Sequence, residues 1–228
     1  VTTLAAERAA KQAEAPVSKA PVKDVFGNAG LMKLVILNFF YQTGDYGYTL
    51  WLPTILKGLT GGNMASVGFL AVLPFVATLA GIYVISLFSD HSGKRRLWVR
   101  FSLYSFAAAL VASVVLRDQM VAAYIALVIC GFFLKSATSP FWSMPGRIAS
   151  PEVAGSARGV INGLGNLGGF CGPYLVGVMM YLYGQNVAVC ALAGSLIIAG
   201  TMTFLLPKQC DLVDSDSDVA IKNQPRNA

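Results

Sequence analysis

Six long apolar stretches constrain the fold of this chain more than any other feature. They cover residues 34–56, 67–88, 97–116, 120–144, 159–183 and 187–206. Each is long enough to cross about 30 Å of hydrocarbon, which takes about 20 residues of α-helix. None alternates apolar and polar residues with a period of two, which argues against the strands of a membrane barrel. The sequence therefore predicts an all-α membrane protein with six transmembrane helices.

The composition supports a lipid environment. Of the 228 residues, 55% are hydrophobic and 12% are charged, whereas a soluble domain carries about 25% charged residues. The four cysteines show no C-x-x-C spacing, and three of them lie inside apolar stretches: Cys130, Cys171, Cys190 and Cys210. We interpret them as small hydrophobic residues and expect neither a disulfide set, nor a metal site, nor a cofactor.

The basic residues fall on one side of the predicted membrane. If the N-terminal segment is cytosolic, the connections on that side hold fourteen Lys and Arg residues, and the other side holds only Lys57 and Arg117. Cytosolic loops of membrane proteins are enriched in basic residues. We therefore expect both termini in the cytosol and the protein in the plasma membrane, which is the inner membrane in a bacterium. Topology explains the net charge of +6, so the lipid bilayer is an expected partner and nucleic acid is not.

The two ends of the chain are more polar than its middle. Residues 1–24 are rich in Ala, Lys, Glu and Pro and predict a solvated cytosolic linker. Residues 208–228 include four aspartates and predict a disordered cytosolic tail. The six-helix bundle is expected between them, over residues 25–207. The chain begins at Val1 without an initiator Met, and we interpret it as a fragment.

A charged loop follows the second stretch, with the sequence SLFSDHSGKRR from Ser86 to Arg96. It resembles the signature loop of the major facilitator superfamily, G-x-L-x-D-x-x-G-R-R/K-R/K. The matching residues are Asp90, Gly93, Lys94, Arg95 and Arg96, while Ser86 and His91 depart from the pattern. The acidic residue can cap the next helix, and the basic run can hold the cytosolic interface. The alternative is a charged loop that serves topology alone.

Two further stretches narrow this resemblance. Residues 46–61 (YGYTLWLPTILKGLTG) and residues 139–177 are similar to the anion:cation symporter branch, which includes sugar-acid, tartrate and phthalate permeases. The family has two six-helix halves, and the resemblance implies that this chain is the C-terminal half. It also implies a missing N-terminal half as partner, where such symporters usually keep their proton-coupling carboxylate and arginine.

A polar stripe crosses the first stretch despite its apolar character. Asn38, Tyr41, Asp45 and Tyr48 are three or four positions apart and therefore share one helix face, with Gln42 beside them. Charged residues inside membrane spans are rare and are usually functional. In the resembled family the first and fourth helices of each half line the central cavity, which implies that this stripe faces the transport path.

The fourth and fifth stretches carry matching polar positions. Lys135, Ser139 and Trp142 share a face of the fourth, and Asn162 and Asn166 share a face of the fifth. The residues predicted to bind substrate are Tyr41, Gln42, Lys135, Ser139, Trp142 and Asn162. Asp45 and Lys135 form either a static ion pair between two helices or a pair that couples a proton to the substrate.

Simpler interpretations exist for several of these residues. Tyr48 and Trp51 suit an interfacial aromatic belt, and Asn166 can bond a neighbouring backbone. The glycines that recur every four residues predict close helix packing: Gly155, Gly159 and Gly163, then Gly165 and Gly169, and Gly168 and Gly172.

The predicted function is proton-coupled symport of a small organic anion, such as a sugar acid or another carboxylate, by alternating access. Lys135 offers a positive charge to the carboxylate, and Tyr41, Gln42, Ser139 and Asn162 offer hydrogen bonds to hydroxyl groups. One alternative is sodium coupling, and another is a half-carrier without transport that has an assembly or regulatory role. An enzyme is not expected, because the spans contain no pair of carboxylates and no nucleophile beside a base.

Overall fold

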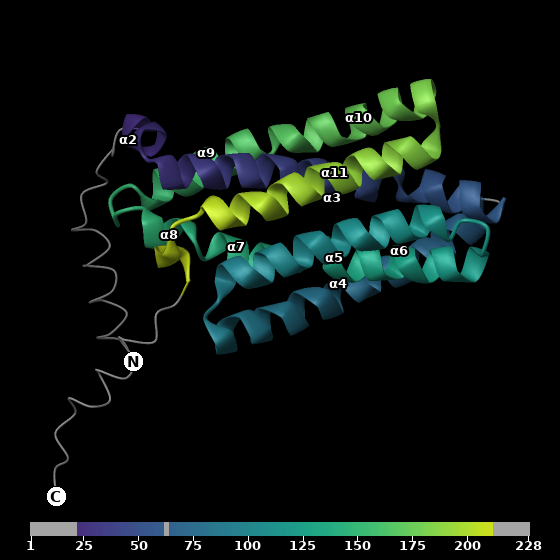
Figure 1. Ribbon diagram of the computed structural model, residues 1–228, viewed down its shortest axis with the longest axis horizontal. Helices are drawn as coiled ribbons and strands as arrows, with labels where there is room; N and C mark the ends of the chain where they lie inside the picture. Colours follow the sequence, from purple (N-terminus) through teal and green to yellow (C-terminus); the bar gives the residue numbers. More distant parts are fainter. Residues whose placement is uncertain (1–21, 62–63, 212–228) are drawn as a thin grey trace, which may run out of the picture.

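Long helices lie side by side along the longest axis of the molecule (Figure 1). The computed structural model describes residues 22–61 and 64–211. Its helices are α2 (Val22–Gly27), α3 (Ala29–Thr60), α4 (Met64–Ser92), α5 (Arg95–Val115), α6 (Met120–Leu134), α7 (Thr138–Trp142), α8 (Pro145–Ile148), α9 (Ala154–Gly165), α10 (Leu167–Tyr183), α11 (Gln185–Met202), η1 (Thr203–Leu205) and η2 (Lys208–Cys210). No strand occurs in these ranges, so the described part of the chain is all-α as predicted.

Four helical segments are long and apolar enough to cross a membrane, within the part that the structure describes. They are Val67–Ser92, Arg95–Val115, Met120–Ile148 and Gln185–Leu205. The other two predicted spans do not meet this criterion. α3 is 32 residues long but carries the polar stripe, and the fifth span is divided at Asn166 into α9 and α10. The prediction of six spans is thus confirmed for four of them.

The helices pack in two related groups of three. α3 packs against α10 and α11, and α6 packs in the same way against α4 and α5, while α5 and α11 contact each other. Exchanging α3 for α6, α4 for α10 and α5 for α11 reproduces these contacts, whereas the smaller contact of α3 with α4 has no counterpart of similar size. An arrangement of this kind is typical of internally duplicated carriers, and it places α3 and α6 in equivalent positions.

Glycines permit the closest contacts in both groups. A Cβ at Gly168 or Gly172 of α10 would collide with the carbonyl oxygens of Phe39 or Thr43 in α3. A Cβ at Gly131 of α6 would likewise collide with the backbone of α4 at Pro74. Small residues let helix backbones approach in this way.

The predicted glycine pattern is only partly used for packing. Gly165 and Gly169 also lie against α3, at the side chains of Asn38 and Tyr46. Gly155, Gly159 and Gly163 have no neighbouring atom within 4 Å of an added Cβ. The packing prediction for these three glycines is therefore not met by any contact within the described residues.

The α4–α5 loop, α8 and η2 lie together at one end of the bundle, which we name the basic end (Figure 1). The predicted cap of α5 by Asp90 is wrong. The Asp90 side chain is 67% exposed and pairs with Arg95 at 3.7 Å, and the N-cap of α5 is Lys94, without a side-chain cap bond. The carboxylate at the start of α5 belongs to Asp211, which accepts hydrogen bonds from the backbone N–H of Arg96 at 2.9 Å and from its Nε at 2.8 Å.

The ends of the bundle extend beyond the predicted boundaries. α2 begins at Val22, and Val25 is fully buried. At the other end, η2 and Asp211 are ordered parts of the basic end, because Cys210 is fully buried and Asp211 is bonded to Arg96. The remainder of the predicted linker and tail lies outside the described residues.

Candidate substrate site

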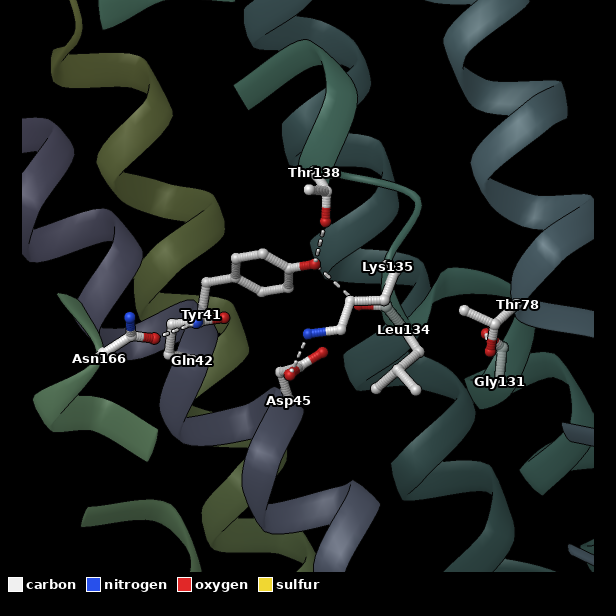
Figure 2. A network of polar contacts seen from close by, with 9 residues as sticks. All are labelled: Tyr41, Gln42, Asp45, Thr78, Gly131, Leu134, Lys135, Thr138 and Asn166. Carbon is white, nitrogen blue, oxygen red and sulfur yellow. Dashed lines mark hydrogen bonds and ion pairs between the residues drawn. The ribbon is translucent and has the colours of Figure 1, made fainter. Parts of the chain in front are cut away.

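The polar face of α3 reaches two interrupted helices at once (Figure 2). On one side Tyr41 and Asp45 face the interruption between α6 and α7. On the other side Gln42 faces the interruption between α9 and α10. Interrupted helices expose backbone carbonyl and N–H groups, which is how many carriers form polar sites inside a bundle.

The α6–α7 interruption covers residues 135–137. Pro140 in α7 has no N–H to donate, so the carbonyl four residues before it loses its helical partner. Tyr41 donates its hydroxyl hydrogen to the carbonyl oxygen of Leu134 at 2.8 Å, and Thr138 Oγ1 lies 3.1 Å from the same hydroxyl. Thr78 from α4 donates to the carbonyl oxygen of Gly131 at 2.8 Å. Side chains from two neighbouring helices thus satisfy the backbone of α6 near its end.

Lys135 stands at the C-terminal end of α6, where the helix dipole favours a positive charge. Its ammonium donates to Asp45 Oδ2 at 2.6 Å and lies 5.4 Å from the centre of the Tyr46 ring. The two partners differ in exposure, because the side chain of Asp45 is 2% exposed and that of Lys135 is 37% exposed. The second oxygen, Asp45 Oδ1, is buried and has no hydrogen-bond partner among the described residues.

The α9–α10 interruption is centred on Asn166. Gln42 donates its Nε2 hydrogen to Asn166 Oδ1 at 2.7 Å, and Asn166 Nδ2 donates to Asn162 Oδ1 at 3.0 Å. Asn38, one turn earlier on α3, donates to the carbonyl oxygen of Ile161 at 3.0 Å. Asn166 therefore bonds the side chains of Gln42 and Asn162, whereas one interpretation of the sequence was a bond from Asn166 to a neighbouring backbone group.

The predicted substrate residues differ in accessibility. Ser139 and Asn162 are exposed, and Gln42, Lys135 and Trp142 are partly exposed. Tyr41 is only 3% exposed, and its hydroxyl is occupied by Leu134 and Thr138. The structure thus gives Tyr41 a supporting role at the α6–α7 interruption.

The aromatic-belt interpretation is wrong for Tyr48. Its side chain is fully buried, and its hydroxyl donates to the carbonyl oxygen of Leu127 in α6 at 2.7 Å. The indole N–H of Trp51 donates to the carbonyl oxygen of Pro173 at 3.2 Å, so both residues join α3 to neighbouring helices.

Thr78, Thr138 and Tyr46 are contacts that the sequence analysis missed. Thr138 could have been found, since it precedes Pro140 by two residues and a proline inside an apolar stretch can interrupt a helix. Thr78 follows Pro74 by four residues, and its hydroxyl also bonds the Pro74 carbonyl. Nothing in the sequence indicates that Thr78 reaches α6.

No metal-binding cluster accompanies this site among the described residues. Residues 22–61 and 64–211 contain no group of three or more His, Cys, Asp or Glu side chains that could hold a metal ion. The site consists of one ammonium, one buried carboxylate and several neutral hydrogen-bonding groups. These groups can hold and release an anion but provide no nucleophile beside a base.

Comparison with known protein families gives a single clear result. Residues 34–217 match the family described as the Major Facilitator Superfamily. The chain belongs to this superfamily. Members of this superfamily are multi-pass membrane transporters and not enzymes.

Curated relatives agree with this assignment. The chain is 34% identical over 159 residues to the quinolone resistance transporter of Acinetobacter baumannii, an alignment that covers 68% of the chain and 36% of the relative. It is 28% identical over 209 residues to a putative tartrate transporter of Agrobacterium vitis, covering 91% and 47%. It is 29% identical over 187 residues to the inner membrane transport protein RhmT of Escherichia coli (strain K12), covering 78% and 42%. The chain thus spans between about a third and a half of the length of these relatives.

Proposed function

We propose that this chain is one half of a secondary transporter that carries a small organic anion, such as a sugar acid or another carboxylate, together with a proton. The observation that carries the proposal is the partly exposed ammonium of Lys135 at an interrupted helix inside a bundle of a transporter family. A related protein is named as a putative tartrate transporter, which agrees with a carboxylate as cargo.

Each accessible polar group has a role in this proposal. Lys135 pairs with the carboxylate of the substrate, since it uses one of its three N–H donors on Asp45. Gln42, Ser139 and Asn162 donate hydrogen bonds to hydroxyl groups, and Trp142 forms an apolar wall. A direct contact between Tyr41 and the substrate stays a prediction. The Tyr41 hydroxyl has to break its hydrogen bond to the Leu134 carbonyl before it can reach a ligand.

The transport cycle requires the other half of the carrier. The described residues contain two three-helix repeats in chain order, one of α3, α4 and α5 and the other of α6, α10 and α11. Together they form one side of a cavity that opens alternately to each face of the membrane. We expect the basic end and both termini on the cytosolic side, because cytosolic loops are enriched in basic residues. We expect residues 1–228 alone to show no saturable uptake in liposomes. Saturable uptake by this chain alone would instead favour a complete carrier built from two copies.

The test uses the full-length carrier in proteoliposomes with radiolabelled gluconate, tartrate and benzoate, and with a quinolone as a further probe. We expect saturable uptake of at least one hydroxycarboxylate that increases with an inward proton gradient. Stimulation by a sodium gradient alone would replace the proton with sodium as the coupling ion.

Variants connect this activity to the site. Lys135→Gln should abolish anion uptake, whereas Lys57→Gln, which changes an exposed lysine in the last turn of α3, should leave it unchanged. Uptake of none of the probes, or full uptake by a folded Lys135→Gln carrier, would refute the proposal. Binding without transport in the full-length protein would favour the assembly or regulatory role.

A further inference from the structure

Asp45 and Lys135 form an unusually unequal ion pair. The carboxylate is almost completely buried, while more than a third of the lysine side chain is accessible. A buried ion pair is stable only if its remaining hydrogen-bonding positions are also satisfied. Here Asp45 Oδ1 is buried without a partner among the described residues. A pair that serves only to join α3 and α6 gains nothing from this free oxygen.

We propose that Asp45 is a proton-binding site of the carrier and that Lys135 exchanges between Asp45 and the substrate carboxylate. This inference rests on the proposed function and adds a proton-binding group in this half, beside any coupling residues of the other half. In the empty state Lys135 pairs with the ionised Asp45, as in Figure 2. In the loaded state a proton resides on the Asp45 carboxyl group, and Lys135 pairs with the anion.

The charge balance supports this exchange. In the empty state the Asp45 carboxylate and the Lys135 ammonium together carry no net charge. In the loaded state the carboxylic acid is neutral, and the ammonium is neutralised by one substrate carboxylate. Both states therefore avoid an uncompensated charge inside the bundle, which would be costly in a low dielectric. The only bond formed or broken is the O–H bond of Asp45, and its proton comes from the solution on the side from which the anion enters.

The position of Lys135 permits the movement. It directly follows Leu134, the last residue of α6, and is the first residue of the interruption over residues 135–137. Its side chain is a flexible four-carbon stem, and Tyr46, whose ring lies near the ammonium, is 38% exposed. The ammonium can therefore turn from the buried Asp45 towards the accessible side of Tyr46 while the backbone remains fixed by Tyr41.

Few other titratable groups face Asp45. Tyr41, one turn earlier on α3, is bonded to Leu134, and α6 contributes Lys135. α10 and α11 contain no acidic or basic residue.

Cys171 and Tyr174 of α10 line a different groove, beside Phe40. Arg158 of α9 lies near Gly146 of α8, and the charged residues of α4 and α5 lie in the turns that flank the α4–α5 loop. In the described part of the chain, Lys135 is thus the charged group positioned to respond to protonation of Asp45.

The first test needs no variant. The full-length carrier in weakly buffered detergent solution is mixed with gluconate, or with another member of the probe set that is transported, and protons are measured with a pH indicator. We expect uptake of about one proton per anion bound, near neutral pH. Anion binding without any proton uptake would overturn the inference and leave the transport of anions intact as a conclusion.

The second test uses Asp45→Asn, which imitates the protonated state. We expect this variant to retain anion exchange across the membrane, to lose the stimulation by an inward proton gradient and to bind anion without proton uptake. Asp45→Glu should restore the stimulation, because it restores a group that ionises. Asp118→Asn, a change in an exposed aspartate, is the matched control and should retain the stimulation.

A static ion pair predicts a different pattern. Asp45→Asn would then lose folded protein, and the double variant Asp45→Asn with Lys135→Met would recover folding. That result, or normal proton stimulation in folded Asp45→Asn, would refute the coupling role. Absence of uptake by the unchanged carrier would instead refute the proposed function, so the two failures are distinguishable.

Discussion

Replacing Asp211 by alanine tests how the end of the chain is attached to the bundle. Asp211 Oδ1 accepts from the Arg96 backbone N–H at 2.9 Å, and Oδ2 accepts from Arg96 Nε at 2.8 Å. Cys210, immediately before it, is fully buried. Loss of the carboxylate should therefore loosen η2 and expose the Cys210 thiol intermittently.

The size of the destabilisation by Asp211→Ala follows from the hydrogen bonds that the substitution removes. A hydrogen bond to a charged group contributes about 1.5–3 kcal/mol when it is well shielded. The Arg96 and Asp211 side chains are each 22% exposed, so water weakens both bonds. A third bond, from Arg96 Nη1 to the carbonyl oxygen of Leu206 at 2.8 Å, survives the substitution. We therefore expect Asp211→Ala to lower the free energy that holds η2 against the bundle by about 1.4–2.8 kcal/mol. The open state, in which η2 is detached and Cys210 is exposed, becomes about 10 to 100 times more populated.

Thiol labelling measures the open state directly. Cys130, Cys171 and Cys190 are replaced by alanine, so that maleimide reports on Cys210 alone. Burial raises the pKa of Cys210 to about 11, so the closed state contains little reactive thiolate at pH 8. Asp211→Ala should increase the labelling rate by about 10- to 100-fold. The pH profile should also move to lower pH, because the exposed thiol returns towards the ordinary pKa.

The Arg117–Asp118 pair supplies the control. Its atoms are 3.7 Å apart, and the side chains are 60% and 90% exposed, so Asp118→Ala should not change the labelling of Cys210. Equal labelling rates in the unchanged chain and in Asp211→Ala would show that other contacts hold η2, and the reasoning above would be refuted.

Two further predictions concern packing and topology. Gly172→Ala should lower the thermal unfolding temperature, because the added Cβ collides with the Thr43 carbonyl. At Gly163 the added Cβ meets open space, so Gly163→Ala should be neutral or stabilising by up to about 1 kcal/mol. Equal unfolding temperatures of the two variants in a fluorescence melt would contradict this. Single cysteines at Thr60 and Ala228 in a cysteine-free background should react with an impermeant reagent from opposite sides of the membrane, and labelling of both from outside would overturn the cytosolic assignment of the termini.

The sequence predicted helix positions well where a single helix crosses the bundle. The apolar stretches 97–116 and 187–206 overlap α5 (Arg95–Val115) and α11 (Gln185–Met202) closely, because hydropathy reports directly on residues that avoid water. Hydropathy did not reveal the interruptions at residues 135–137 and at Asn166. Both lie within stretches that remain apolar, and they depend on backbone groups that find partners on other helices.

The sequence also could not predict the polar contacts between residues that are far apart in the chain. Helical periodicity placed Tyr41, Asp45 and Tyr48 on one face, but it could not separate them by environment. Tyr48 is in the core, Tyr41 holds a carbonyl and Asp45 pairs with Lys135. The contact between Arg96 and Asp211 joins residues that are 115 positions apart, and no local pattern distinguishes Asp211 from the aspartates that follow it.

The pairing of α3 with α6 also has a consequence for biosynthesis. Asp45 leaves the ribosome 90 residues before Lys135, so α3 enters the membrane while its carboxylate has no ammonium to neutralise it. A lone carboxylate costs about 2.5–3.5 kcal/mol at the centre of an inserted helix. α3 therefore depends on a helix that has not yet been synthesised, and a ribosome that stops before α6 releases a chain with an unpaired acid in lipid.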